Sequence, residues 1–165
     1  MTKWPSSPPS RGAEMDAVRV LVTAEDFDPG REIERLSSGE GQSGALATFI
    51  GLVRGAADGV SAMTLEHYPG MTEKQIAALI EEARARWALD RVTVIHRIGR
   101  LLPGERIVFV GVAGRHRAES FAACEFLIDW LKTRAPFWKL EETAEGDRWV
   151  ETRDEDEKRA LRWER

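Results

Sequence analysis

Apolar residues recur along this chain with two periods, one typical of strands and one typical of helices. Period-two alternation, or an unbroken apolar run, predicts strands over residues 17–23, 44–54, 62–68, 91–99, 105–114, 137–142 and 147–152. The strand at 105–114 is apolar on both faces, so we expect it in the centre of a sheet. The turns LLPG and AEGD each separate two strands and predict hairpins.

Helical spacing places three helices between these strands. Asp28 before Pro29 suits an N-cap and a first helical position, which predicts a helix over residues 29–38. Thr72 and Gln75 have the spacing of a capping box at the start of a second helix. The apolar stripe of that second helix consists of Ile76, Leu79, Ile80, Ala83 and Trp87.

The third helix is expected to run from about His116 to Arg134. Its inward positions are Phe121, Cys124, Leu127, Ile128 and Leu131. Pro136 disfavours helical backbone at Ala135, so the helix is expected to end there. The charged tail, residues 154–165, is compatible with a further helix.

The order of these elements, β-α-β-β-α-β-β-α-β-β, mixes hairpins with helices. It predicts an α+β fold whose sheet is mixed but largely antiparallel. A chain of 165 residues suits one domain, here residues 17–165. Residues 1–16 are rich in Pro and Ser and are expected to form a disordered leader.

Composition narrows the function classes. The net charge of −4 argues against a general nucleic-acid binder. Cys124 is the only cysteine, which excludes an intrachain disulfide and a cysteine-based zinc site. The three histidines lack the spacing of a metal motif, so we expect neither a metal nor a cofactor. The N-terminus has no signal-peptide pattern and no apolar run is long enough to span a bilayer, which makes the cytoplasm the simplest location.

The stretch GRHRAES, residues 114–120, is a candidate anion site. A glycine leaves a central strand, and His116 and Arg117 stand where a helix begins. The free backbone N–H groups and the helix dipole at that point favour an anion such as a phosphate. The simpler alternative is that both side chains cover a solvated helix end.

The stretch KTRAPFWK, residues 132–139, carries two lysines around a chain reversal. Lys132 lies in the last helical turn and Lys139 on the next strand, so both can face one cleft. Two close ammonium groups lower each other's pKa, which leaves a more nucleophilic amine at neutral pH. The same pair can instead only neutralise a phosphate or carboxylate, and a lysine at a helix C-terminus is common for dipole reasons alone.

Other polar and aromatic residues carry weaker signals. Arg54 ends a buried strand beside the Gly-rich loop 55–61, a favourable place for a ligand-orienting arginine, although strand-end arginines usually face solvent. His67 and His96 are interpreted as core histidines, and Cys124 as a core thiol rather than a catalytic one. For the aromatic pair at positions 137 and 138, core packing is the better interpretation than a heterocycle pocket.

Four longer stretches carry a family resemblance. They are TLEHYPGMTEKQI (64–76), RVTVIHRIGRLLPGE (91–105), VFVGVAGRHRAESF (108–121) and LKTRAPFWKLEETAEGDRWVE (131–151). In these blocks the chain resembles the molybdopterin synthase catalytic-subunit family over about residues 17–163. The resemblance implies an α/β-hammerhead-type fold and a homodimer within a heterotetramer. The other component is a small ubiquitin-like sulfur-carrier subunit with a C-terminal Gly-Gly thiocarboxylate.

The resemblance also implies a reaction, in which sulfur passes from the carrier to cyclic pyranopterin monophosphate and forms the dithiolene of molybdopterin. Lys132 and Lys139 match the family's catalytic lysines. The expected substrate-binding residues are Arg54, His116, Arg117, Lys132, Lys139, Leu140, Glu141 and Arg153. Arg153 is the residue expected to reach a neighbouring subunit's pocket. Whether Lys132 acts as an electrostatic clamp, an acid/base or a covalent acceptor is left open by the residues.

The chain departs from the family pattern at Leu52, where members often carry a lysine, and in the short loop 55–61. Two other functions compete with sulfur transfer. A non-catalytic module that docks a ubiquitin-like partner would not need the set of Lys132, Lys139, His116 and Arg117. An enzyme that binds a nucleotide or acyl-CoA would be expected to carry a Gly-rich phosphate loop after a strand, and no such loop is present in the sequence.

Overall fold

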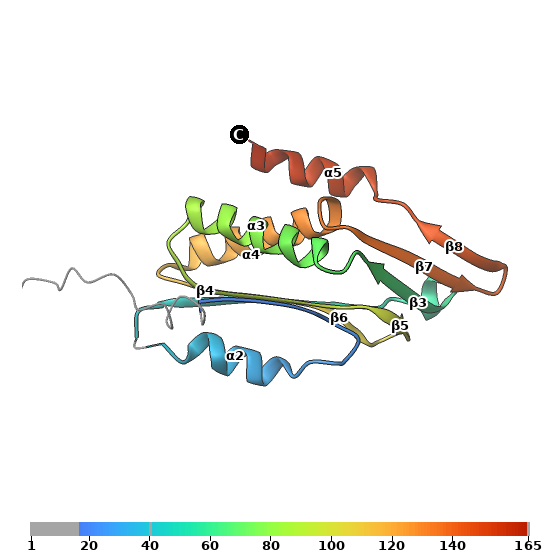
Figure 1. Ribbon diagram of the computed structural model, residues 1–165, viewed down its shortest axis with the longest axis horizontal. Coiled ribbons are helices and arrows are strands. Elements are labelled where there is room, and N and C mark those ends of the chain that lie inside the picture. Colours follow the sequence, from blue (N-terminus) through green and yellow to red (C-terminus); the bar gives the residue numbers. More distant parts are fainter. Residues whose placement is uncertain (1–16, 40, 165) are drawn as a thin grey trace, which may run out of the picture.

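Two four-stranded sheets and the helices packed on them form the molecule (Figure 1). The computed structural model describes residues 17–39 and 41–164. The leader expected at residues 1–16 lies outside the described residues. Mixed pairing in one sheet and antiparallel pairing in the other confirm the predicted α+β class.

The first sheet carries most of the apolar core. Its strands, in spatial order, are β1 (Val18–Thr23), β4 (Leu89–Arg97), β6 (Arg106–Gly114) and β2 (Ala45–Leu52). The pair β1–β4 is parallel, and the pairs β4–β6 and β6–β2 are antiparallel. The predicted central position of the doubly apolar strand is confirmed, since β6 has a partner on each side. β2 is left as an edge strand of this sheet.

The second sheet holds the residues after the Pro136 bend. It consists of β5 (Gly99–Leu101), β3 (Val60–His67), β7 (Phe137–Thr143) and β8 (Gly146–Val150), all antiparallel. A short 3-10 helix, η1 (Ala56–Asp58), precedes β3. Lys139 pairs in register with buried Leu65, whereas Trp138 pairs with exposed Glu66. Because strand side chains alternate, one face of β7 is turned inward and the other outward.

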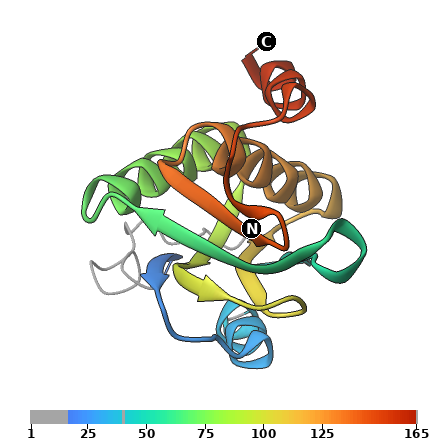
Figure 2. The same ribbon diagram turned by 90° about the vertical axis from the view of Figure 1, so that its right-hand side faces the viewer.

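Helices α2 (Pro29–Ser37), α3 (Met71–Arg86) and α4 (Arg117–Thr133) cover the two faces of the first sheet. Helix α5 (Asp154–Leu161) packs on α4 and is followed by the 3-10 helix η2 (Arg162–Glu164). Figure 2 shows α2 on one side of the molecule and α3, α4 and α5 on the other. Arg162 and Trp163 bind the buried carboxylate of Asp129 on α4, which ties the C-terminal end of the chain to that helix.

The main core lies between the first sheet and the pair α3–α4. Side chains from both layers, among them Val94, Val110, Ile80 and Phe126, are fully buried there. Such apolar burial is the dominant favourable contribution to folding. Within the described residues, no helix is both long and apolar enough to cross a membrane.

Two local predictions were wrong. The cap of α3 is Gly70, whose N–H donates to Glu73 at 2.7 Å, whereas Thr72 lies inside the helix with its hydroxyl on Pro136. Gly70 has a φ of 80°, which a glycine adopts without strain. Phe121 was expected inward, but it is 67% exposed, because helical spacing cannot distinguish a core face from an uncovered apolar one.

Candidate functional site

A cavity of about 740 Å³ opens where the end of β2, the end of α4, the inner face of β7 and the segment 150–159 meet. None of these segments makes the cavity alone. The Pro136 bend turns the chain from α4 into β7, and Arg162 and Trp163 hold α5 against α4, so that the segment before α5 crosses the opening. The cavity is therefore a product of tertiary packing.

The expected convergence of the two lysines is confirmed. Lys132, in the last turn of α4, and Lys139, on β7, both line this cavity. Their surroundings differ, because the Lys132 side chain is 46% exposed while Lys139 is more deeply enclosed. Lys132 also has a partner, since its Nζ lies 3.4 Å from Oδ1 of Asp156 on α5.

The surroundings of Lys139 lower the pKa of its amine. Burial lowers its pKa below the ordinary value of 10.5, and the positive charges of Lys132 and Arg153 lower it further. The carboxylates of Asp156 and Glu141 act in the opposite direction without cancelling the effect. A lysine whose pKa is lowered in this way gives up its proton more readily near neutral pH.

Two arginines of the predicted set also line the cavity. Arg54 comes from the chain just after β2, and Arg153 from the segment that leads into α5. With Lys132, Lys139 and Arg159 they make five basic groups. Five acidic side chains stand among them: Asp58, Glu141, Glu151, Glu155 and Asp156. The cavity is thus rich in charge of both signs rather than uniformly basic.

Leu140 and Glu141 follow Lys139 but differ in their placement. Glu141 lines the cavity and forms an ion pair with Arg148 at 2.8 Å. Leu140 does not line the cavity, because alternation along β7 turns its side chain to the outer face, opposite Trp149. A ligand contact from Leu140 stays a prediction, and it would have to be made by the main chain.

His116 and Arg117 stand at the other end of α4. His116 occupies the N-cap position, and both side chains are exposed. Among the described residues, neither side chain has a hydrogen bond or ion pair. At 1.5 Å per residue, the helix separates Arg117 from Lys132 by about 22 Å. Within one chain, His116 and Arg117 therefore do not reach the cavity that Lys132 and Lys139 line.

Sequence reasoning missed several cavity residues. His96 lines the cavity although its strand pattern indicated only a core position. Asp58, from the loop 55–61, lines it as well, as does Leu52, the position where a family lysine is absent. Nothing in the local pattern signals these contacts, because distant segments create them.

Two kinds of chemistry find no support at this cavity. Burial raises the pKa of the Cys124 thiol to about 12, so this cysteine is not an activated nucleophile. In the part of the chain that the structure describes, no group of three or more His, Cys, Asp or Glu side chains is arranged to hold a metal ion.

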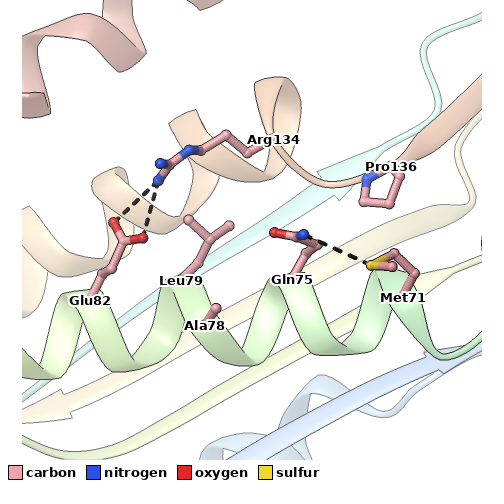
Figure 3. A pocket seen from close by; sticks show the side chains of 7 residues that line it. All are labelled: Met71, Gln75, Ala78, Leu79, Glu82, Arg134 and Pro136. Atoms are coloured by element: carbon pink, nitrogen blue, oxygen red, sulfur yellow. Dashed lines mark hydrogen bonds and ion pairs between the residues drawn. The ribbon is translucent and has the colours of Figure 1, made fainter.

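A second, smaller cavity of about 330 Å³ lies beside α3. Figure 3 shows its lining, with the ion pair of Arg134 and Glu82 at one end and the contact of Gln75 with Met71 at the other. It contains none of the residues predicted to bind substrate. The candidate site is therefore the larger cavity.

Comparisons with known proteins agree on one family. The family model described as MoaE protein matches residues 22–134. The molybdopterin synthase catalytic subunit of Escherichia coli strain K12 is 54% identical over 151 residues, which cover 90% of this chain and 100% of that protein. The corresponding protein of Yersinia pestis is 56% identical over 151 residues, covering 90% and 99%.

Solved structures show the same relationship. The molybdopterin biosynthesis MoaE protein from Burkholderia ambifaria MC40-6 has a TM-score of 0.77 and 46% identity, and the match covers 90% of this chain and 99% of that one. A complex of subunits 1 and 2 of molybdopterin-converting factor from Helicobacter pylori 26695 shares the fold, with a TM-score of 0.64, 19% identity and coverage of 83% and 92%. The chain belongs to the MoaE family, the catalytic subunits of molybdopterin synthase.

Proposed function

We propose that this chain transfers sulfur from the thiocarboxylated C-terminus of a small carrier subunit to cyclic pyranopterin monophosphate, which yields the dithiolene of molybdopterin. One observation carries the proposal: the two lysines converge on one cavity, and the pKa of the enclosed Lys139 is lowered. A module that only docks a partner has no need of an enclosed amine with a lowered pKa. The substrates that the proposal names are those implied by the family resemblance of the four sequence blocks, and membership of the MoaE family supports them.

The carrier's terminal Gly-Gly suits the cavity. Glycine has no side chain, so an extended tail can pass between β7 and the segment 150–156. The thiocarboxylate then lies near Lys132, whose ammonium forms an ion pair with Asp156 in this structure. The carboxylate of Asp156 already binds Lys132, which supports the proposal that this ammonium binds the terminal thiocarboxylate of the tail.

The lysine pair also suits the chemistry of transfer. After the thiocarboxylate sulfur has formed a bond to a substrate carbon, water adds to the carrier's acyl carbon, and negative charge develops on the carbonyl oxygen, where a nearby ammonium group stabilises it. The carbon–sulfur bond on the carrier side then breaks, which leaves the sulfur on the substrate and a carboxylate on the carrier. Lys139, whose pKa is lowered, is suited to exchanging a proton during the reaction. Arg54 is placed at the same cavity to bind the substrate phosphate.

A second copy of the chain is part of this proposal. β2 is an edge strand, and Leu46, Phe49, Ile50 and Leu52 along it are exposed, as is Phe121 on the adjacent α4. Apolar side chains on a free strand edge are typical of a surface that another chain covers. We propose that two copies pair along this edge and that each pair carries two carrier subunits.

Such pairing explains how His116 and Arg117 reach a substrate. β2 begins beside the N-terminal end of α4, where Ala45 pairs with Gly114, and ends at the cavity with Leu52. If two β2 strands pair antiparallel, the start of each lies beside the end of the other. His116 and Arg117 of one copy then lie near the cavity of the second copy and can bind the phosphate there. We further propose that the complex works in the cytoplasm.

A single-turnover assay tests the proposed function. The purified chain is mixed with cyclic pyranopterin monophosphate and thiocarboxylated carrier, and the dithiolene product is followed as its fluorescent oxidised derivative. We expect product that depends on the thiocarboxylate, with the carboxylate form of the carrier as the matched control. If the carrier binds but no product forms, the docking module is the correct function.

A further inference from the structure

A buried histidine at the cavity has no role in the reaction described above. His96, on β4, is only 6% exposed, yet its side chain lines the cavity. Its ring stacks on Phe137, which lines the same cavity, with ring centroids 3.8 Å apart and an angle of 18° between the planes. The sheet and the stacked ring therefore hold this imidazole in one orientation.

The hydrogen bond of His96 determines its tautomer. Nδ1 lies 2.8 Å from the carbonyl oxygen of Arg97. Because a carbonyl oxygen only accepts, Nδ1 must be the nitrogen that carries the proton. Burial, together with the nearby charge of Lys139, lowers the pKa of His96 to about 4, so the ring is neutral at neutral pH. Nε2 consequently presents a lone pair.

That lone pair has no protein partner, because no donor among the described residues reaches Nε2 of His96. In the described residues, the side-chain polar atoms that are fully buried and lack a partner are Arg97 Nε, Glu119 Oε2 and Trp130 Nε1. His96 Nε2 also lacks a partner but does not belong to this set, so it is not fully buried. The atom is therefore accessible, and because the rest of the residue is buried, it opens on the cavity.

His96 differs in kind from the other polar groups near Lys139. Ammonium and guanidinium groups have no acceptor, so Lys132, Lys139 and Arg54 can only donate. Two of the cavity's carboxylates already have cationic partners, since Glu141 binds Arg148 and Asp156 binds Lys132. His96 is thus a neutral hydrogen-bond acceptor in the wall of the cavity.

We propose that Nε2 of His96 accepts a hydrogen bond from an N–H group of the bound ligand, which makes His96 a ligand-binding residue. The inference rests on the proposed function. Two ligand groups have the required chemistry: a ring or amino N–H of the pterin, and the backbone N–H of the carrier's terminal glycine. A ligand without such a donor leaves a desolvated acceptor unpaired, so His96 selects against it.

Nitrogen-15 NMR of the three histidines tests the inference directly. In the free protein we expect His96 with its proton on Nδ1 and no change of protonation between pH 5.5 and pH 8. In one arm cyclic pyranopterin monophosphate is added anaerobically, and in the other a peptide that ends in Gly-Gly. A shift of the Nε2 resonance typical of an accepted hydrogen bond supports the inference, and the arm in which it occurs identifies the donor.

A His96 proton on Nε2 in the free protein would overturn the inference. So would an unmoved Nε2 resonance when backbone amide shifts show that either probe is bound. Those results leave the proposed function intact, because binding is still seen. If neither probe changes any resonance at saturating concentration, the proposed function fails and the inference falls with it.

Matched variants separate ligand binding from a structural role. His96→Phe keeps a flat ring against Phe137 and removes only the acceptor, so we expect roughly 10- to 100-fold weaker binding of the donor ligand. His67→Phe is the control, since His67 does not line the cavity, and we expect its affinity within about twofold of wild type. His96→Gln should recover part of the lost affinity, because its amide oxygen can accept. If His96→Phe unfolds, His96→Leu, which also lacks an acceptor, replaces it with the same expected loss. Equal affinity of wild type and a folded variant that lacks an acceptor would overturn the inference.

Discussion

The two ends of α4 carry the same kinds of residue in opposite surroundings. At the C-terminal end, Lys132 faces a cavity that β7 and the segment before α5 enclose, and Lys139 is partly buried beside it. At the N-terminal end, the side chains of His116 and Arg117 are exposed and form no hydrogen bond or ion pair with the described residues. Both ends were predicted to bind anions from the sequence.

The difference lies in what each end has packed against it. An exposed cation is screened by water and binds an anion weakly, whereas an enclosed one interacts in a lower dielectric. At the enclosed end, burial has lowered the pKa of Lys139. The enclosed end is a site within one chain, and the exposed end becomes one only when a second surface covers it.

The largest expected effect comes from removing an amine at the enclosed end. Lys132→Ala and Lys139→Ala should each reduce product formation about 100- to 1000-fold, because each removes a cation from a site where charge develops. Lys132 is half exposed, so its loss should leave the thermal unfolding temperature nearly unchanged. Single-turnover rates measure the effect, and a Lys132→Ala protein with near-normal turnover would contradict the lysine assignment.

Arg117→Ala tests the exposed end and the second copy together. Alone, it should weaken pterin binding about tenfold while the chain stays folded, since one charged hydrogen bond is lost. Mixed dimers of Arg117→Ala and Lys132→Ala should recover roughly a quarter of wild-type activity, because half the dimers are mixed and each of those has one complete site.

The control for this mixture is each variant alone under the same conditions. Recovery would show that the two ends of α4 meet across a dimer. If the mixture only averages the two separate activities, His116 and Arg117 act within one chain or not at all.

Acid stability sharpens the comparison at the enclosed end. His96 has a pKa of about 4 when folded and 6.5 when unfolded, so between these values the unfolded chain binds a proton that the folded chain does not. Stability from this group is complete above pH 6.5 and is lost as the pH falls to about 4. The loss is on the order of 3 kcal/mol, from about 2.5 units at roughly 1.4 kcal/mol each.

Urea unfolding of wild type and His96→Phe from pH 7.5 to pH 4 measures this loss. The carboxylates contribute equally to both proteins, so their difference isolates His96. We expect the free energy of unfolding to fall less in His96→Phe than in wild type as the pH is lowered. A difference that stays constant with pH would mean that His96 is not held neutral by burial.

The smallest effect is a gain in stability. Lys139→Met removes a partly buried ammonium whose pKa is lowered, and the apolar methionine side chain fills a similar volume. We expect an increase of about 1 kcal/mol in the free energy of unfolding at pH 7, together with loss of activity. Lys132→Met, at the more exposed position, is the matched control and should change stability by less than half as much.

Local pattern predicted much of this architecture. The apolar residues on both faces of β6 were sufficient to predict a central strand, and the Pro136 bend to predict that Lys132 and Lys139 face one cavity. Phe121 was misplaced because helical spacing predicts an apolar face but not what covers it. His96 and Asp58 were missed at the cavity because their neighbours there come from segments distant in sequence.

The central claim is that packing at the C-terminal end of α4 produces an amine with a lowered pKa. Its most direct test is an NMR titration of the Lys139 side chain in wild type and in Lys132→Ala. The account predicts that Lys139 titrates clearly below 10.5 in the wild type, and that its pKa rises when the Lys132 charge is removed. A Lys139 that titrates at 10.5 and ignores the loss of Lys132 would contradict it.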